Sequence, residues 1–126
     1  MKLSIIIPMY NEQESLDALF MELSGLFSQE AKTEIIFIND GSSDDTLSIL
    51  ESKIKNYPSW KVINLYRNYG KSVALQAGFD NSKGEIIATM DADLQDNPKE
   101  IYNLIKELEK GYDVVSGWKK NRKDPL

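Results

Sequence analysis

Short apolar runs alternate along the chain with longer segments of mixed polarity. The runs are rich in Ile and Val, and they cover residues 3–7, 35–38, 62–65, 86–90 and 114–115. Runs of this length with little polar alternation are typical of strands that are buried on both faces of a parallel sheet. The pattern therefore predicts five buried strands.

The segments between the runs carry apolar residues at helical spacing. Leucine and phenylalanine recur at i, i+3, i+4 and i+7 from Leu16 to Phe27, and the segment from Leu47 to Tyr57 repeats this pattern. Small residues from Val73 to Gly78 predict a third, tightly packed helix. A fourth helix is predicted to begin with a cap at Asn97 followed by a proline, and to stop near Gly111.

Alternating strands and helices predict an α/β fold with a three-layer, Rossmann-like parallel sheet, because right-handed crossovers join the strands of successive βα units. The chain has 126 residues, of which 41% are apolar. A chain of this length supports one core. We therefore expect a single domain over residues 1–126.

Composition narrows the chemistry that such a domain can perform. The chain contains no Cys and no His, which excludes disulfides, thiolate metal sites and imidazole bases and leaves oxygen ligands for a hard cation. The 15 basic and 20 acidic residues give a net charge of -5, which argues against nucleic acid as a partner. No apolar stretch approaches the roughly 20 residues of a membrane span, and we expect a cytoplasmic setting.

Polar residues follow each of the first four runs. Ligands of open parallel α/β sheets bind outside the carboxyl ends of the strands, so these residues should converge at one edge. They are Pro8, Tyr10, Asn11 and Glu12; Asn39, Asp40, Gly41, Ser42 and Ser43; Arg67, Asn68, Gly70 and Lys71; and Asp91, Ala92, Asp93 and Gln95.

Asp91-Ala92-Asp93 is the most distinctive of these segments. If the strand stays extended through it, both carboxylates point the same way with Ala92 behind them. Two such charges favour a bound Mg²⁺, which proteins usually hold with one or two carboxylates plus substrate phosphates, as in a nucleoside diphosphate. The alternative is a solvated acidic turn ahead of the next helix.

Each of the other polar segments also has two interpretations. Asp40 opens a turn-and-cap segment, yet at a strand tip its carboxylate can accept hydrogen bonds from a base or a ribose. Tyr10 offers a flat face for a base, or its segment only starts a helix with Asn11 as the cap. Arg67 and Lys71 fit the negative groups of a nucleotide, or a solvated helix start.

Four segments, in order and spacing, resemble the family 2 glycosyltransferases of GT-A fold. They are residues 5–12, 39–44, 67–71 and 90–95. The Asp-Ala-Asp-Leu-Gln sequence, and Val115 to Trp118 followed by basic residues, look most like the polyprenyl-phosphate glycosyltransferases that act on dolichyl or undecaprenyl phosphate. The chain would be the N-terminal, donor-binding part of such an enzyme.

The resemblance implies roles for individual residues. Those expected around the nucleoside of a UDP- or GDP-sugar are Pro8, Tyr10, Glu12 and Asp40. Those expected to bind Mg²⁺ or Mn²⁺ with the diphosphate are Asp91, Asp93 and Gln95. Ala92 belongs to the same donor site, and Lys119 would lie near the donor or acceptor phosphate. Asn39 departs from the family, in which many members have an acid there, and we expect altered hydrogen bonding without loss of the site.

The implied reaction is an inverting attack of a polyprenyl-phosphate oxygen on the anomeric carbon, opposite the leaving diphosphate. A phosphate monoester has a second pKa near about 6, so this acceptor is largely ionised and needs little help from a base. Family members continue beyond this length with acceptor elements, the usual catalytic base and often two membrane helices. We therefore expect a truncated domain whose full-length protein acts at the cytoplasmic face of a membrane.

Two alternatives compete with this interpretation. A receiver-like Mg²⁺-dependent phosphoacceptor module has a similar length, but it needs acids after strands one and three, whereas here the acids follow strands two and four. The other alternative is a fragment that binds the donor without transferring the sugar. The basic run at 119–123 fits an anionic acceptor, acidic lipid headgroups or a solvated loop.

Overall fold

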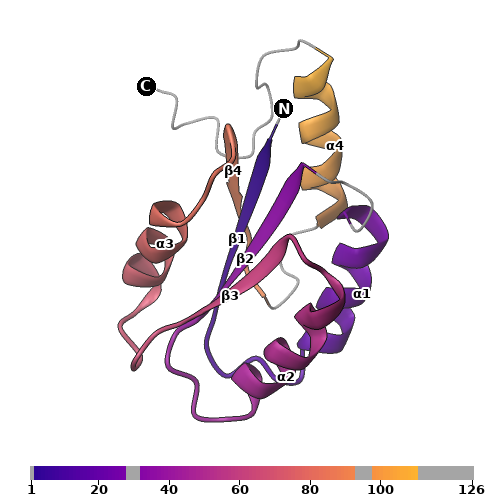
Figure 1. Cartoon of the computed structure of the whole chain (residues 1–126). Coiled ribbons are helices and arrows are strands. Elements are labelled where there is room, and N and C mark those ends of the chain that lie inside the picture. Colours follow the sequence, from indigo (N-terminus) through magenta and orange to yellow (C-terminus); the bar gives the residue numbers. More distant parts are fainter. Residues whose placement is uncertain (1, 28–31, 93–97, 111–126) are drawn as a thin grey trace.

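The computed structural model describes residues 2–27, 32–92 and 98–110 (Figure 1). Strands and helices alternate along them, as predicted. The strands are β1 (Leu3–Met9), β2 (Thr33–Asn39), β3 (Trp60–Asn64) and β4 (Ile86–Thr89). The helices are α1 (Leu16–Phe27), α2 (Thr46–Lys53), the 3₁₀ helix η1 (Ile54–Asn56), α3 (Lys71–Asp80) and α4 (Pro98–Glu109). None of the helices in these ranges is long and apolar enough to cross a membrane.

The four strands of the described part form one parallel sheet in the order β3-β2-β1-β4. The helix α3 covers one face, and α1, α2 and α4 lie on the other, which gives three layers (Figure 1). The predicted fold class is confirmed. The chain moves outward from β1 to β3 and then returns through α3 to β4 on the far side of β1. Ligands of open α/β sheets bind at such a reversal of strand order.

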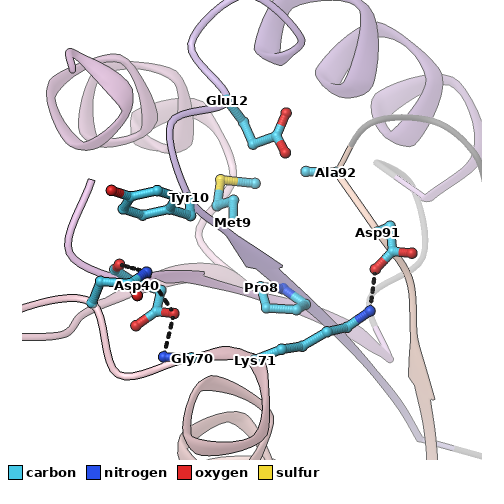
Figure 2. Close-up of a pocket in the computed structure, with 10 residues that line it drawn as sticks. Pro8, Met9, Tyr10, Glu12, Asp40, Gly70, Lys71, Asp91 and Ala92 are labelled. Atoms are coloured by element: carbon cyan, nitrogen blue, oxygen red, sulfur yellow. Dashed lines mark hydrogen bonds and ion pairs between the residues drawn. The ribbon is translucent and has the colours of Figure 1, made fainter. Parts of the chain in front are cut away.

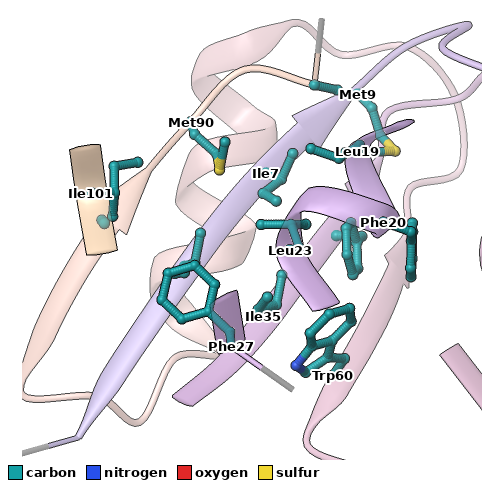
Figure 3. Close-up of a cluster of buried hydrophobic side chains, with 14 of the residues drawn as sticks. Ile7, Met9, Leu19, Phe20, Leu23, Phe27, Ile35, Trp60, Met90 and Ile101 are labelled. Atoms are coloured by element: carbon teal, nitrogen blue, oxygen red, sulfur yellow. The ribbon is translucent and has the colours of Figure 1, made fainter. Parts of the chain in front are cut away.

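Alternate residues of the central strands pack into different layers. Ile7 of β1 belongs to the larger core beneath α1 and α4, whereas Ile6 packs in the smaller core with Ala74 of α3. Figure 3 shows the larger core around Phe20. The ring of Phe20 stacks on that of Phe37 with the centroids 4.9 Å apart. These apolar contacts fix the helices against β1 and β2, whose carboxyl ends lead into the loops of the site.

Strand burial differs from the prediction at the margins of the sheet. The strands β1 and β2 are buried almost throughout, but β3 and β4 are only partly buried, because each has a sheet neighbour on one side among the described residues. The second predicted helix is also shorter, since α2 ends at Lys53 and tightens into η1. Pro98 begins α4 as predicted. The predicted strand at 114–115, the cap at Asn97 and the stop at Gly111 lie outside the described residues.

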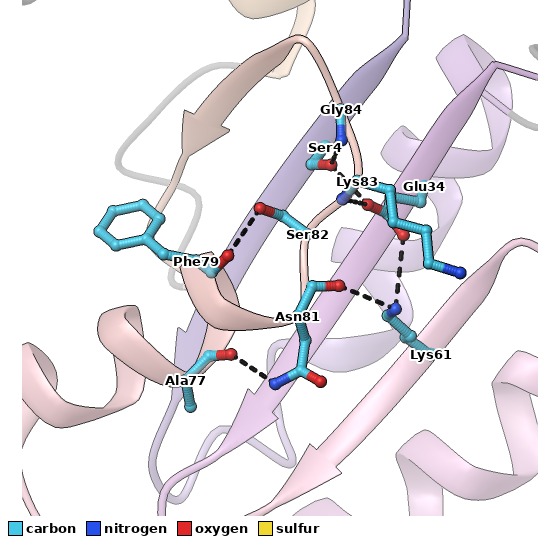
Figure 4. A network of polar contacts seen from close by, with 9 residues as sticks. All are labelled: Ser4, Glu34, Lys61, Ala77, Phe79, Asn81, Ser82, Lys83 and Gly84. Atoms are coloured by element: carbon cyan, nitrogen blue, oxygen red, sulfur yellow. Dashed lines mark hydrogen bonds and ion pairs between the residues drawn. The ribbon is translucent and has the colours of Figure 1, made fainter.

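A polar network fastens the amino edge of the sheet, opposite the candidate ligand edge (Figure 4). Glu34 of β2 accepts hydrogen bonds from Ser4 Oγ and from the backbone N–H of Lys83 at 2.6 Å. Its other oxygen lies 3.5 Å from Lys61 Nζ. Burial by itself would raise the pKa of Glu34, but the hydrogen bonds from Ser4 and Lys83 and the charge of Lys61 outweigh burial and lower the pKa below 4.5. The network ties the end of the α3 crossover to β1, β2 and β3.

Candidate functional site

A pocket opens at the carboxyl edge of the sheet, where all four strands lead into loops (Figure 2). Its volume of about 270 Å³ lies near the lower end of the range for small-molecule sites. The residues that line it are Pro8, Met9, Tyr10, Glu12, Asp40, Asn68, Gly70, Lys71, Asp91 and Ala92. The predicted convergence of polar residues from four strand ends is therefore present in the structure.

The loop after β1 is joined to the loop after β2 by hydrogen bonds. Asn11 has a positive φ of 53°, and its Oδ1 accepts a bond from the backbone N–H of Ser43 at 2.8 Å. The backbone N–H of Asn11 donates to Ser42 Oγ at 2.9 Å. The interpretation of Asn11 as a helix cap is wrong, because α1 begins only at Leu16. Its amide instead fixes the loop that leads to α2.

Gly41 allows the β2 loop to pack against the loop after β3. Its φ is +68°, a region that disfavours side chains. A Cβ atom there would overlap the backbone of Arg67 and Asn68. The two loops therefore touch through their main chains, next to Asp40 and Asn68, which line the pocket.

Asp44 supplies the cap at the start of α2, one residue before the structural cap position. Its Oδ1 accepts the backbone N–H of Thr46 at 3.0 Å, and its Oδ2 accepts the backbone N–H of Gln13 at 3.4 Å. Its slight burial would raise the pKa, but hydrogen bonds from the hydroxyl and backbone of Thr46 and from Gln13 outweigh this and lower the pKa below 3.8. The predicted turn-and-cap role of the segment that begins at Asp40 is confirmed for this acid.

Asp40 follows β2 directly and is 4% exposed. Its carboxylate accepts hydrogen bonds from the backbone N–H of Tyr69 at 2.8 Å and of Gly70 at 3.0 Å, and from Asn68 Nδ2 at 3.2 Å. Asp40 thus holds the loop that enters α3. The sequence predicted hydrogen bonds to a base or ribose for this carboxylate, whereas the structure shows its oxygens accepting bonds from its own chain.

Lys71 and Asp91 meet across the pocket (Figure 2). The ammonium of Lys71, the first residue of α3, lies 2.7 Å from Asp91 Oδ1. The strand β4 ends at Thr89, and Asp91 and Ala92 lie in the segment that follows it, while Asp93 lies outside the described residues. Ala92 is nevertheless 2% exposed within the larger core, and the half-exposed Asp91 carboxylate faces the pocket.

The loop after β1 gives the pocket a mixed apolar and polar wall. Pro8 and Met9 are the last residues of β1, and Tyr10 follows with 47% of its surface exposed. The carboxylate of Glu12 accepts a hydrogen bond from Ser15 Oγ at 3.2 Å. The backbone N–H of Glu12 donates to Thr46 Oγ1 at 3.0 Å. The wall thus offers an accessible aromatic face beside a fixed carboxylate.

Some candidate residues lie elsewhere, and some lining residues were not candidates. Arg67 does not line the pocket, because its guanidinium lies over the ring of Tyr69, 5.4 Å from the centroid. The candidates outside the described residues are Asp93, Gln95 and Lys119. Among the lining residues, Asn68 and Gly70 were expected at this edge without a role of their own, and Met9 was not a candidate. The polar segment around Asn68 was a usable signal, whereas Met9 looks like ordinary core.

Asp91 can hold a cation, since the Lys71 ammonium already occupies a position beside its carboxylate. The described residues contain no cluster of three acidic or other typical ligands. A divalent cation bound here would therefore take Asp91 as a ligand and complete its coordination with phosphate oxygens and other groups, as Mg²⁺ commonly does. The residues present fit a hard cation in that way.

Comparison with known proteins gives a consistent result. The model of glycosyl transferase family 2 matches residues 4–125. An undecaprenyl-phosphate 4-deoxy-4-formamido-L-arabinose transferase of Serratia proteamaculans is 43% identical over 98% of this chain and 38% of its own length. A dodecaprenyl-phosphate galacturonate synthase of Rhizobium johnstonii is 38% identical over 100% of this chain and 38% of its own length. The chain thus spans a little over a third of these relatives.

Solved structures share the same arrangement of strands and helices. S. aureus TarS in complex with UDP-GlcNAc superposes with a TM-score of 0.70 and 26% identity, over 85% of this chain and 32% of that one. The mannosyltransferase PcManGT from Pyrobaculum calidifontis, in complex with GDP-Man and Mn²⁺, gives a TM-score of 0.75 at 24% identity over the same shares. At 24% identity, the similarity to PcManGT supports the fold alone. Both solved structures have the GT-A fold.

Proposed function

The chain belongs to glycosyl transferase family 2, and on that premise we propose that its pocket binds a nucleotide-sugar donor together with a divalent cation. The donor is a UDP- or GDP-sugar, and the whole protein transfers the sugar to a polyprenyl phosphate. Because the acceptor is a lipid, the reaction takes place at a membrane, and we propose the cytoplasmic face as its side. The acceptor assignment is supported by relatives that are named for undecaprenyl- and dodecaprenyl-phosphate substrates.

The observation that carries the proposal is the position of the pocket. It lies where the order of the strands reverses, and its wall combines an exposed aromatic ring, the ammonium of a lysine and three carboxylates from four separate loops. A nucleoside diphosphate needs these groups: a flat surface for the base, acceptors for ribose hydroxyls and positive charge for phosphates. A receiver-like module is set aside, since the family model covers nearly the whole chain.

In this proposal each loop of the pocket contacts a different part of the donor. The base lies against Pro8 and Tyr10, and Glu12 accepts hydrogen bonds from the nucleoside. Asp40 acts by holding the loop at 68–70 in place, and any contact of its own with the base is additional. The diphosphate lies towards Lys71 and Asp91. Asp93, Gln95 and Lys119 keep the roles that the family resemblance gives them.

The cation would be Mg²⁺ or Mn²⁺, and when bound it would supply positive charge to neutralise the leaving diphosphate. Asp91 is its ligand within the described residues. In the transfer step, a bond forms between an acceptor phosphate oxygen and the anomeric carbon, while the bond from that carbon to the diphosphate breaks. The electron pair leaves with the nucleoside diphosphate, and the configuration inverts.

A thermal-shift panel tests donor binding directly. The chain is heated with UDP-sugars or GDP-sugars, each with and without Mn²⁺, and ADP with Mn²⁺ serves as the control for nonspecific diphosphate binding. A ligand that binds the native state raises the melting temperature. We expect one base to stabilise the chain only when Mn²⁺ is present. Equal shifts for all three nucleotides, or none, would contradict the proposed site.

A transfer assay separates donor binding from the complete reaction. The chain covers 38% of the length of the relatives that carry acceptor names, so we propose that it binds the donor without completing transfer. The assay follows labelled sugar into undecaprenyl phosphate in detergent. We expect turnover from the whole protein and none from these 126 residues; turnover by the isolated chain would refute the fragment proposal.

A further inference from the structure

We propose that Lys71 is an exchangeable counter-ion for Asp91: a divalent cation displaces its ammonium from the carboxylate, and the released ammonium then binds a phosphate of the donor. This inference rests on the proposed function and adds a coupling between cation binding and nucleotide binding. The juxtaposition that carries it is an ion pair that spans the pocket at 2.7 Å, between the start of α3 and the loop after β4.

The pair is exposed enough to open. The side chain of Lys71 is 62% exposed and that of Asp91 is 42% exposed. Ion pairs in such surroundings are weak, because water solvates the separated charges well. A divalent cation carries twice the charge of an ammonium and binds carboxylate oxygens directly. It can therefore replace Lys71 at Asp91 at modest cost.

The start of α3 favours the second half of the exchange. A positive side chain in the first turn of a helix is disfavoured by the helix dipole, whereas an anion is favoured there. Lys71 is the first residue of α3, so its pairing with Asp91 offsets an unfavourable local field. Once Asp91 binds a cation, a phosphate beside this helix start meets both the dipole and the released ammonium.

The exchange moves the side chain of Lys71, whose backbone position is held by neighbouring contacts. Its backbone is fixed by the residue before it, because Gly70 donates its N–H to the buried Asp40 carboxylate at 3.0 Å. Ala92, on the other side of the pair, is anchored in the core with 2% exposure. The flexible four-carbon side chain of Lys71 can therefore change its position while the backbone on both sides of the ion pair stays fixed.

The coupling predicts opposite effects of one substitution on two ligands. Without Lys71, Mn²⁺ no longer competes with an ammonium for Asp91, so Mn²⁺ alone should bind more tightly. The donor nucleotide, by contrast, loses a charged partner and should bind more weakly when Mn²⁺ is saturating. A lysine that only stabilises the fold would weaken both ligands, and one that only binds phosphate would leave Mn²⁺ affinity unchanged.

Calorimetry of the 126-residue chain tests this with Mn²⁺ alone, and then with UDP and GDP at saturating Mn²⁺. For Lys71→Met we expect Mn²⁺ affinity to rise about threefold to fivefold, the scale of an exposed ion pair. We expect nucleotide affinity to fall about tenfold, the scale of a lost charge-assisted hydrogen bond. Lys71→Arg keeps the charge, so both its Mn²⁺ affinity and its nucleotide affinity should stay near those of the wild type. Lys61→Met, at the opposite edge, should change neither affinity.

The outcomes separate the exchange from the function on which it rests. A wild-type chain that binds neither Mn²⁺ nor either nucleotide overturns the proposed function and the exchange with it. A wild-type chain that binds both, with Mn²⁺ affinity unchanged or lowered in Lys71→Met, overturns the exchange alone. Circular dichroism of each variant confirms that the helices remain formed.

Discussion

The strand β2 has a carboxylate at each end, and the two carboxylates are used differently. Glu34 lies near its start and Asp40 follows its last residue, and both share the face of β2 that α3 covers, with Ile36 and Ile38 between them. Asp40 holds the loop that enters α3, while Glu34 binds Lys83 just beyond its exit. Carboxylates at the two ends of β2 therefore hold the beginning and the end of the α3 crossover.

The difference lies in what surrounds each carboxylate. At the amino edge, Glu34 is enclosed by Ser4, Lys61 and Lys83, and its contacts connect neighbouring segments of the chain. At the carboxyl edge, Asp40 organises a loop whose other side lines a pocket. Similar hydrogen bonding therefore serves stability alone at one edge, and at the other edge it serves stability together with the proposed ligand binding. Substitutions at the two edges should separate these effects.

The largest effect is expected where the two loops of the carboxyl edge touch. Gly41→Ala places a Cβ against the backbone of Arg67 and Asn68 at a φ of +68°, and we expect it to lower the free energy of unfolding by about 3 kcal/mol. Gly25→Ala is the matched control, because nothing lies within 4 Å of its added Cβ. In α1 it should stabilise the chain by up to about 1 kcal/mol. Urea denaturation measures both, and equal stabilities would rule out the close loop contact.

The next effect compares the two carboxylates directly. In Asp40→Asn, an amide N–H₂ must face the backbone N–H of Tyr69 or of Gly70, so we expect a loss of about 2 kcal/mol in stability and weaker nucleotide binding. Glu34→Gln retains an acceptor for Lys83, so it should cost about 1 kcal/mol and leave nucleotide affinity unchanged. Urea denaturation and calorimetry check these values. Weakened nucleotide binding in Glu34→Gln would break the distinction between the two edges.

The acid sensitivity of the amino edge should also follow from Glu34. Its pKa is lowered in the folded state, so its contribution to stability is present above about pH 4.5 and is lost as the pH falls through the folded-state pKa. We expect the free energy of unfolding of the wild type to fall below that pH, and Glu34→Gln to show a shallower decline. Asp44, whose pKa is also lowered, accounts for part of the remaining decline. Parallel acid profiles for the wild type and Glu34→Gln would contradict this assignment.

The smallest effect is expected at the exposed margin of the amino-edge network. Lys61 Nζ lies 3.5 Å from Glu34 and donates to the backbone oxygen of Asn81 at 3.0 Å. Because the lysine is partly exposed, Lys61→Met should cost less than about 1 kcal/mol. Thermal denaturation at low and high salt measures this, and the difference from the wild type should shrink as salt rises. A larger cost at high salt would mean that packing, and not charge, holds this residue.

The sequence predicted the elements and the convergence of polar residues well, because both follow from local pattern and topology. Apolar runs marked the strands, and the carboxyl ends of parallel strands must share an edge. The same reasoning predicts that Asp40 and Asp91 lie at one edge, and both line the pocket. It also predicted the first residue of α4 from Pro98.

The details that the sequence did not predict depend on contacts between distant segments. The sequence analysis did not single out Glu34, because its partner Lys83 lies far away in sequence. Asn11 had the composition of a helix cap, but its amide bonds to Ser43 across two loops instead. The Lys71 ion pair with Asp91 was likewise invisible, because it requires the return of the chain from β3 to β4.

The proposed function depends on Asp91 as part of a cation-dependent nucleotide site at the carboxyl edge. The most direct test is calorimetric titration of UDP and GDP, with and without Mn²⁺, into the wild type and Asp91→Asn, with Glu34→Gln as the control from the amino edge. We expect the wild type and Glu34→Gln to bind one nucleotide in the presence of Mn²⁺, and Asp91→Asn to lose this binding. Unchanged Mn²⁺-dependent affinity in a folded Asp91→Asn chain would contradict it.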